Sequence, residues 1–240
     1  MNRILFEKCE IVGGVATFGG DRASHVMNIL HGEVGQILKT GEINGRIGTG
    51  EIVAIDYGES GSTVSVRVCH DIESPTPWID LLLAPPRPRV MKHLLPQLAS
   101  LGVGRIVLAG AKKVEKDFWG ATLLKEENYR PLLIDGLMQA GTSIMPEILC
   151  RRNFKRFLEY ELDEMFPSVA RIVAHPRPDA SHTPHMSGRP LLAVGPEGGW
   201  TDDEVEALNA KGFTCLSLGP RILRTETATI ALIATIAALA

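Results

Sequence analysis

Two glycine-containing turns near the end of the chain hold the residues best suited to bind a ligand. The first turn, residues 195–199, follows the apolar run Leu191–Val194, and the second, residues 219–221, follows an alternating run at residues 213–218. Glycine-rich turns let a ligand approach backbone N–H groups closely, and they interrupt any helix. If both runs are neighbouring strands, the turns meet at the carboxyl edge of one sheet, where open α/β folds bind their ligands.

The residues after each turn predict helices that position it. Thr201 and Glu204 have the spacing of a capping box, in which each side chain bonds the other's backbone N–H, and Gly212 marks the end of that helix. Residues 227–240 are apolar on all sides. Because this segment is shorter than the roughly 20 residues that span a bilayer, we expect a helix buried in a core or a subunit interface.

Upstream, apolar strands alternate with amphipathic helices. The continuous apolar run at residues 78–84 is typical of a parallel strand that is buried on both faces. Further strands are predicted at residues 104–109 and 171–174, and helices at residues 91–101 (with Pro96 as a local fault), 129–140 and 153–165. This rhythm predicts an α/β domain with a parallel sheet.

The first 72 residues have a different pattern. Short β candidates separated by glycines lie at residues 11–18, 35–39, 43–47, 50–55 and 63–68, which predicts a small barrel. One helix interrupts them, with Asp21 as its expected cap and Gly32 as its end. The proline-containing residues 73–79 are the expected linker.

The two turns, extended to residues 195–205 and 217–228, resemble the signature of the RsmE family. Members of that family are SPOUT methyltransferases with a trefoil knot, which place a methyl group on uridine N3 of small-subunit ribosomal RNA. The resemblance implies a PUA-like β-barrel that binds RNA at residues 1–72, a linker at 73–79 and a knotted SPOUT domain at 80–240.

The resemblance also implies S-adenosyl-L-methionine as the cofactor. Arg221 and Arg224 are then the candidates for stabilising charge on the target base, while Glu226 would orient an arginine, accept the proton through water or favour the helix dipole. Glu197 has two open roles, as a cofactor ligand or as an acceptor of N–H groups at the turn. The expected cofactor-binding residues are Val194, Gly195, Glu197, Gly198, Gly199, Leu218, Gly219, Ile222 and Leu223.

Candidate RNA-binding residues lie in three places where this chain departs from the family pattern. Asn28 and His31 stand where relatives carry arginine, and Met138 and Thr142 replace a glutamate and an arginine. These replacements remove groups that would contact phosphate or base, so the substrate stays open. The residues expected to contact RNA are His25, Arg87, Arg89, Lys92 and Gln139.

The distribution of charge supports a polyanionic partner. Residues 80–156 hold 13 Lys and Arg against 7 Asp and Glu, a net charge of +6, whereas residues 1–72 and 157–240 have net charges of -3 and -5. Ribosomal RNA or the small subunit would therefore meet the middle segment first, although a solvated face without a partner remains the alternative. The cations concerned include Arg87, Arg89, Lys92, Lys112, Lys113, Lys116, Arg151 and Arg152.

Composition and the spacing of cysteines and histidines limit the expected compartment and metal content. The start of the chain lacks the apolar run of a signal peptide, and the four cysteines form no CxxC pair, so we expect a cytoplasmic protein without structural zinc. His182 and His185 lack an evident third ligand, and Pro184 between them favours a loop, so no metal is expected.

Three functions are compatible with these sequence features. The first is an RNA uridine methyltransferase, which by family resemblance would work as a homodimer. The second is a non-catalytic RNA-binding or ribosome-assembly protein of the same fold, and a methyltransferase acting on a different RNA is a variant of the first. The third is an unrelated dinucleotide-using enzyme, which the absence of G-x-G-x-x-G and G-x-x-x-x-G-K-[ST] disfavours.

Overall fold

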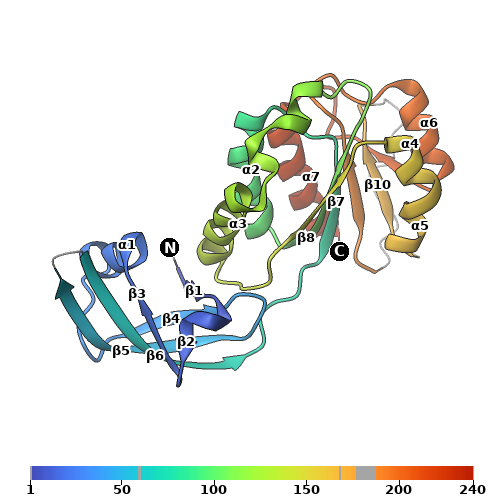
Figure 1. The fold of residues 1–240 in the computed structure, drawn as a ribbon. Coiled ribbons are helices and arrows are strands. Elements are labelled where there is room, and N and C mark those ends of the chain that lie inside the picture. Colours follow the sequence, from blue (N-terminus) through green and yellow to red (C-terminus); the bar gives the residue numbers. More distant parts are fainter. Residues whose placement is uncertain (1, 59–60, 168, 177–187, 240) are drawn as a thin grey trace. The chain divides into compact units, whose positions relative to one another are not determined.

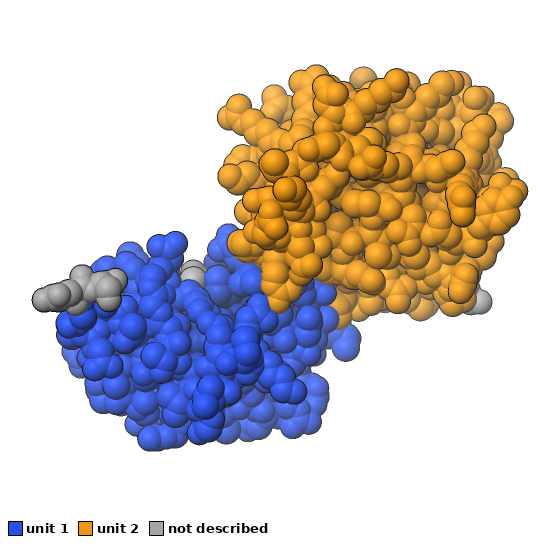
Figure 2. All heavy atoms as spheres, in the orientation of Figure 1, with its two compact units in different colours: residues 1–76, 134–145 blue, residues 77–133, 146–240 orange. Residues whose placement is uncertain are grey.

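The computed structural model of the protein describes residues 2–58, 61–167, 169–176 and 188–239. The chain divides into two compact units, which Figure 2 distinguishes by colour. Unit 1 holds residues 1–76 and 134–145, and unit 2 holds residues 77–133 and 146–240. The boundary at residue 76 falls within the expected linker, whereas residues 134–145, expected in the second domain, group with unit 1.

Unit 1 is built on a curled six-stranded sheet with the order β1-β4-β5-β6-β3-β2 (Figure 1). All of its pairings are antiparallel except that of β1 with β4. The predicted small barrel takes the form of a half-barrel, in which the edge strands β1 and β2 do not pair with each other within the described residues. The strands are β1 (Ile4–Phe6), β2 (Ile11–Val12), β3 (Val15–Phe18), β4 (Ile37–Glu42), β5 (Ile47–Gly58) and β6 (Gly61–Ile72).

The helix of unit 1 differs from its prediction at its start. Helix α1 (Gly20–Ser24) is preceded by Gly19 as its N-cap, so Asp21 lies inside the first turn and does not cap. The helix continues as the π-helical turn η2 (His25–Ile29) and packs Ala23 and Val26 into the core of the sheet. A 3₁₀ turn, η1 (Lys8–Glu10), joins β1 to β2.

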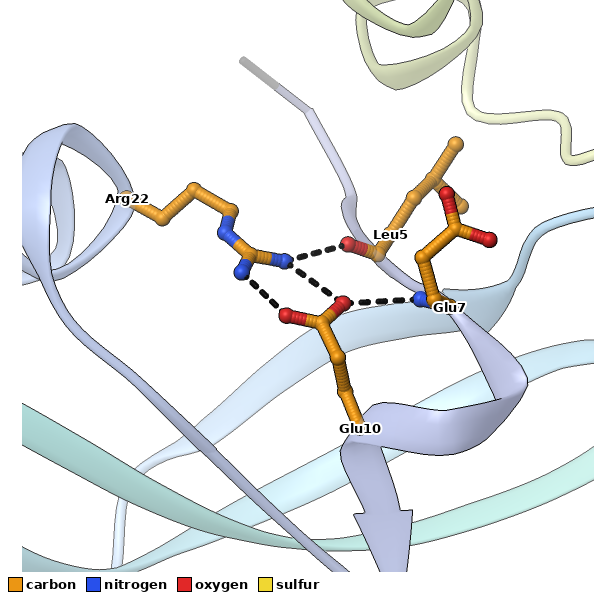
Figure 3. A network of polar contacts seen from close by, with 4 residues as sticks. All are labelled: Leu5, Glu7, Glu10 and Arg22. Atoms are coloured by element: carbon orange, nitrogen blue, oxygen red, sulfur yellow. Dashed lines mark hydrogen bonds and ion pairs between the residues drawn. The ribbon is translucent and has the colours of Figure 1, made fainter.

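Arg22 of α1 forms an ion pair with η1 and a hydrogen bond with β1. The guanidinium of Arg22 pairs with the Glu10 carboxylate and donates to the Leu5 carbonyl at 3.1 Å, while Glu10 also accepts the Glu7 backbone N–H at 2.8 Å (Figure 3). The hydrogen bond from Arg22 is the main reason that the pKa of Glu10 lies below its usual value. Arg22 also lies over the ring of Phe18 at 5.4 Å.

Residues 134–145 belong to unit 1 because the first residues of the chain hold them. The backbone N–H groups of Asn2 and Arg3 both donate to the Met138 carbonyl at 3.1 Å, and Arg3 Nε donates to the Gly141 carbonyl at 3.0 Å. Ser143 adds a hydrogen bond from its Oγ to the Gly45 carbonyl at 2.6 Å. Sequence patterns could not show these contacts, because they join residues about 100 positions or more apart in the chain.

Unit 2 is an α/β unit, as the sequence predicted. Its six strands are all parallel, in the order β12-β10-β11-β7-β8-β9. The central strands β7 and β11 are buried along their whole length, as expected for strands covered on both faces. The strands are β7 (Ile79–Leu83), β8 (Val103–Ala109), β9 (Glu147–Arg151), β10 (Arg171–Ala174), β11 (Leu191–Val194) and β12 (Thr214–Leu216).

Helices cover both faces of this sheet (Figure 1). One face carries α2 and α7, while the other carries the continuous helical segment α4-η5-α5 together with α6. On the second face, Phe157 and Val205 are fully buried against the strands. The helical elements are α2 (Pro88–Ser100), η3 (Lys116–Gly120), η4 (Thr122–Leu124), α3 (Glu126–Ala140), α4 (Phe154–Arg156), η5 (Phe157–Glu161), α5 (Leu162–Met165), α6 (Asp202–Ala210) and α7 (Thr225–Leu239).

Two details of unit 2 depart from the local sequence signals. Helix α2 begins at Pro88, earlier than predicted, because proline fits the first turn of a helix. The helix also continues through Pro96, since its buried face of leucines and Met91 packs on the sheet. Strand β9 was not predicted, and its residues are only partly buried at the edge of the sheet.

Helix α7 packs into unit 2 as the apolar terminal segment predicted. Leu232, Ile233 and Ile236 are buried. Across the residues that the structure describes, no helix is long and apolar enough to cross a membrane. The threading of a knot is not tested by these strand pairings and stays a prediction.

We predict that Glu10→Gln lowers the free energy of unfolding by about 1 kcal/mol at pH 7, because a charged hydrogen bond is lost at a partly exposed site. Arg22 lowers the pKa of Glu10 in the folded state. The stabilisation is therefore present at pH values above the usual carboxyl pKa of 4.5, and it is lost as the pH falls through the lowered pKa. Urea denaturation at several pH values measures the difference.

Glu51→Gln is the matched control, because its pair with Arg67 spans 3.3 Å between largely exposed side chains. Its effect should stay within about 0.5 kcal/mol. A loss for Glu10→Gln that does not change with pH would contradict the assignment of the stabilisation to the ion pair.

Candidate functional site

A cavity of about 300 Å³ opens at the carboxyl ends of β10, β11 and β12. These three strands are neighbours in the sheet, so the loops that follow them converge. We call this space the glycine-loop cavity. Its lining consists of Ala174, His175, Pro176, residues 194–200, Leu216, Ser217, Leu218, Gly219, Arg221, Ile222, Leu223, Thr225, Ala228 and Leu232.

The first glycine loop follows the buried end of β11 and turns sharply. The Gly199 N–H donates to the Pro196 carbonyl at 2.8 Å, and Gly199 has a φ of +68°, which side chains rarely adopt. A Cβ at Gly195 would lie 3.0 Å from the backbone nitrogen of Trp200, so a larger residue there would crowd the loop. The indole of Trp200 stacks on Phe154 at 5.3 Å and anchors the end of the loop in the core.

Neighbouring segments fix the same loop from two sides. The Glu197 carboxylate accepts the backbone N–H of Arg87 at 3.1 Å, just before α2 begins. The Lys113 ammonium donates to the Gly198 carbonyl at 2.7 Å. Of the two roles that the sequence left open for Glu197, the observed contact is with a backbone N–H group, while the residue also lines the cavity.

The second loop places apolar side chains at the mouth of the cavity. Ser217 Oγ accepts the Gly219 N–H at 3.2 Å, and Gly219 has a φ of +94°. Beyond this turn Ile222 is 93% exposed, although large aliphatic side chains usually avoid water. Apolar side chains held open beside a cavity suit a ligand with a flat, apolar part.

The three charged residues expected to act in catalysis lie in two places, one at the cavity and the other at the first turn of α7. Arg221 lines the cavity, whereas Arg224 and Glu226 are not among its lining residues. Arg224 is exposed, and its carbonyl accepts the Ala228 N–H in the first turn of α7. Glu226 is half-buried in that turn.

The candidate RNA-contacting residues do not form one group. Arg87, Arg89 and Lys92 are exposed at the start of α2 in unit 2, where Arg87 Nε also donates to Glu115 at 3.0 Å. His25 and Gln139 belong to unit 1. His25 is in the π-helical turn, and its Nε2 is buried without a hydrogen-bond partner among the described residues.

The sequence prediction missed part of the cavity lining, including Trp200, His175 and Pro176. Trp200 directly follows the first glycine loop, and its burial against Phe154 is a long-range contact. His175 and Pro176 follow β10, a strand that was predicted. Because β10 lies beside β11 and β12, its loop reaches the same edge of the sheet. Strand order cannot be read from a single sequence, so this neighbourhood was not predicted.

The expectation that the chain binds no metal stays a prediction. The described residues contain no group of three or more His, Cys, Asp or Glu that could hold an ion. His182 and His185, the only pair considered from the sequence, lie outside the described residues.

Comparison with known proteins gives a consistent family. Residues 73–237 match the model of a family described as an RNA methyltransferase domain. The ribosomal RNA small subunit methyltransferase E of Treponema pallidum is 29% identical over 245 residues, which cover 99% of this chain and 91% of that protein. A protein of that name from Borreliella burgdorferi, numbered 1, is 30% identical over 145 residues, 60% of each chain.

Two solved structures share the fold over nearly the whole chain. A ribosomal RNA small subunit methyltransferase E from Neisseria gonorrhoeae, bound to S-adenosyl methionine, has a TM-score of 0.73 at 24% identity and covers 100% of this chain and 98% of its own. A putative methyltransferase from Legionella pneumophila, in complex with the same cofactor, has a TM-score of 0.76 at 24% identity, with 99% and 97% covered.

Proposed function

Since the chain belongs to the family of RNA methyltransferases, as its two loop motifs predicted, we propose that it transfers a methyl group from S-adenosyl-L-methionine to N3 of a uridine in small-subunit ribosomal RNA. The observation that carries the proposal is the glycine-loop cavity. All nine residues expected to bind the cofactor line it, although they come from two loops separated by a helix and a strand.

The cavity has the properties that this cofactor requires. Backbone groups of the two glycine loops are free of bulky side chains and suit the hydrogen-bonding edges of adenine and ribose. Leu218, Ile222 and Leu223 are exposed apolar side chains at its rim and suit the faces of the adenine ring. When bound, S-adenosyl-L-methionine supplies a methyl group that its sulfonium already activates, so the protein needs no covalent nucleophile.

The protein's own task is then to orient the target and to handle charge. Uridine N3 carries a proton that must leave, and negative charge develops on the flanking carbonyl oxygens. A positioned arginine stabilises such charge by about 3–4 kcal/mol. Arg221 at the cavity and Arg224 at the start of α7 are assigned this role, and Glu226 is assigned the orientation of an arginine or the acceptance of the proton through water.

A second candidate is a non-catalytic RNA-binding or ribosome-assembly protein of the same fold. It is favoured because Asn28, His31, Met138 and Thr142 stand where relatives would carry polar groups near the RNA. In this chain Asn28 donates to Ser24 at 3.0 Å within its own helix. A methyltransferase acting on another RNA would show the same replacements, so product analysis decides between them.

Two further properties belong to the proposal. We place the protein in the cytoplasm, where ribosomal RNA is its partner. We also assign a homodimer, because α7 buries one side in its own unit and presents Thr227, Ala234 and Ala238 to the outside. Small side chains on a rigid helix allow close packing against a second copy.

We expect N3-methyluridine to be missing at one position of small-subunit RNA in a strain without the gene. Mass spectrometry of nucleosides and RNA fragments measures this, and incubation of those subunits with the purified protein and cofactor should restore the product. If the N3-methyluridine level is unchanged and another methylated nucleoside is missing instead, the acceptor is that other nucleoside. Absence of any transfer would favour the non-catalytic candidate.

We predict that Arg224→Ala folds normally and binds the cofactor within about twofold of the wild-type affinity, since Arg224 is exposed and outside the cavity lining. Methyl transfer should fall by about 10²- to 10³-fold, because the charge on the base loses its stabilising partner. Calorimetry and a single-turnover transfer assay measure the two quantities. Arg224→Lys should restore part of the rate, and full activity of Arg224→Ala would exclude Arg224 from the mechanism.

We expect a dimer at micromolar concentration and a dissociation constant raised at least about 10-fold in Ala234→Glu, because a charge would be buried in the contact. Sedimentation equilibrium measures both. Ala210→Glu, at the exposed end of α6, is the matched control and should not change the association. A wild-type monomer at that concentration would rule out the assigned interface.

A further inference from the structure

A second concavity of about 480 Å³ lies at the carboxyl ends of β8 and β9. It carries three cations, Lys112, Arg152 and Lys155, and we call it the basic groove. None of its lining residues lines the glycine-loop cavity. The other residues of its lining are Gly110, Asn153, Phe154, Thr201, Asp203, Glu204 and Ala207.

The fold brings the cations together through a close approach of two strand ends. The Gly110 N–H donates to the Arg151 carbonyl at 2.9 Å, and a Cβ at Gly110 would lie only 1.9 Å from the Arg152 carbonyl oxygen. Only glycine fits there. The segment after β8, which carries Lys112, is therefore held directly beside the segment after β9, which carries Arg152 and Lys155.

Each wall of the groove is ordered by its own contacts. Arg152 Nη2 donates to the Trp119 carbonyl at 3.0 Å, and its guanidinium lies over the Trp119 ring at 5.7 Å. The Asn153 side chain accepts the Arg156 N–H at 3.0 Å and caps the helix that carries Lys155. The cations thus project from fixed backbone and not from a flexible tail.

The lining holds two acidic residues against three cations, so its net charge is +1. The buried Glu204 carboxylate accepts backbone N–H groups of Thr201 at 2.8 Å and Lys112 at 2.7 Å, so backbone donors already satisfy it. Asp203 is the remaining acid. Within the part of the chain that the structure describes, neither Lys112 nor Lys155 forms an ion pair.

The groove is physically joined to the first glycine loop. Glu204 connects Lys112 to the start of α6, and the next residue, Lys113, donates to the Gly198 carbonyl. Both spaces lie in unit 2 at the carboxyl edge of the same sheet. A polyanion in the groove would therefore lie beside a segment that also supports the glycine-loop cavity.

We propose that the basic groove binds the phosphodiester backbone of the RNA substrate, as a docking subsite separate from the nucleotide that receives the methyl group. The inference rests on the proposed function for the identity of the polyanion. Free ammonium groups beside an ordered guanidinium match a run of phosphates, which bind Lys and Arg through charge and release counterions. The excess of cations in residues 80–156 is thereby assigned a specific place.

The test removes two charges from the groove in Lys112→Ala/Lys155→Ala. Binding to naked small-subunit ribosomal RNA should weaken about 10-fold at roughly 0.1 M salt, and the slope of log affinity against log salt should fall by about 1.5. Cofactor affinity and the maximal rate of transfer should not change, since neither lysine lines the cavity. Filter binding over a salt series, calorimetry and steady-state transfer measure these quantities.

Lys39→Ala/Lys125→Ala is the matched control, because it removes the same charge from exposed positions outside the groove that are not among the cations expected to meet RNA. It should change RNA affinity by less than about twofold. An equal loss in both double variants would overturn the proposal in favour of a general charge effect. A loss seen with intact subunits but not with naked RNA would overturn it in favour of an acidic protein partner.

The outcome is separable from that of the proposed function. Binding to naked RNA is measured without methyl transfer, so a protein that transfers nothing would still show the groove's contribution. Conversely, a protein that transfers methyl groups normally with both lysines removed, at every RNA concentration, would retain the proposed function and lose the groove.

Discussion

The buried carboxylate of Glu204 is the contact on which the carboxyl edge of unit 2 depends. A carboxylate that is only 8% exposed must be compensated by donors, and here the donors are the backbone N–H groups of Thr201 and Lys112. One donor belongs to the start of α6 and the other to the loop after β8. A single side chain therefore holds two segments together. One is the start of α6, which follows the first glycine loop, and the other is the loop after β8, which carries Lys112 of the basic groove.

Local signals explain which parts of this arrangement were predictable. Strand β11, the capping box at Thr201 and the burial of α7 follow from apolar runs, spacing and glycine placement, which are properties of adjacent residues. The Glu204 to Lys112 bond joins residues 92 positions apart, and no local pattern encodes it. The strand order of unit 1 has the same limit, because which strands lie at the edges is a property of the whole sheet.

The site was predicted to the same degree and for the same reason. Residues of the two glycine loops were identified because the loops are contiguous in sequence, whereas His175 and Pro176 needed the neighbouring position of β10. The capping role expected of Asp21 failed because Gly19, two residues earlier, has the extended backbone that a cap requires. Helix ends depend on backbone angles that the choice of side chain constrains only weakly.

The replacements in unit 1 and the groove in unit 2 have one electrostatic explanation. Asn28 and His31 stand where the family resemblance implied arginine, and residues 1–72 carry a net charge of -3, so that unit contributes little attraction for a phosphate backbone. The cations of residues 80–156 supply that attraction, and three of them are fixed by the fold in one groove. Because the Lys112 and Lys113 segment also supports the first glycine loop, backbone docking and cofactor binding act on one continuous piece of structure. A polyanion in the groove and a cofactor in the cavity would contact neighbouring residues of that segment, and the two sites would be coupled to the extent that one ligand changes the segment's contacts to the other.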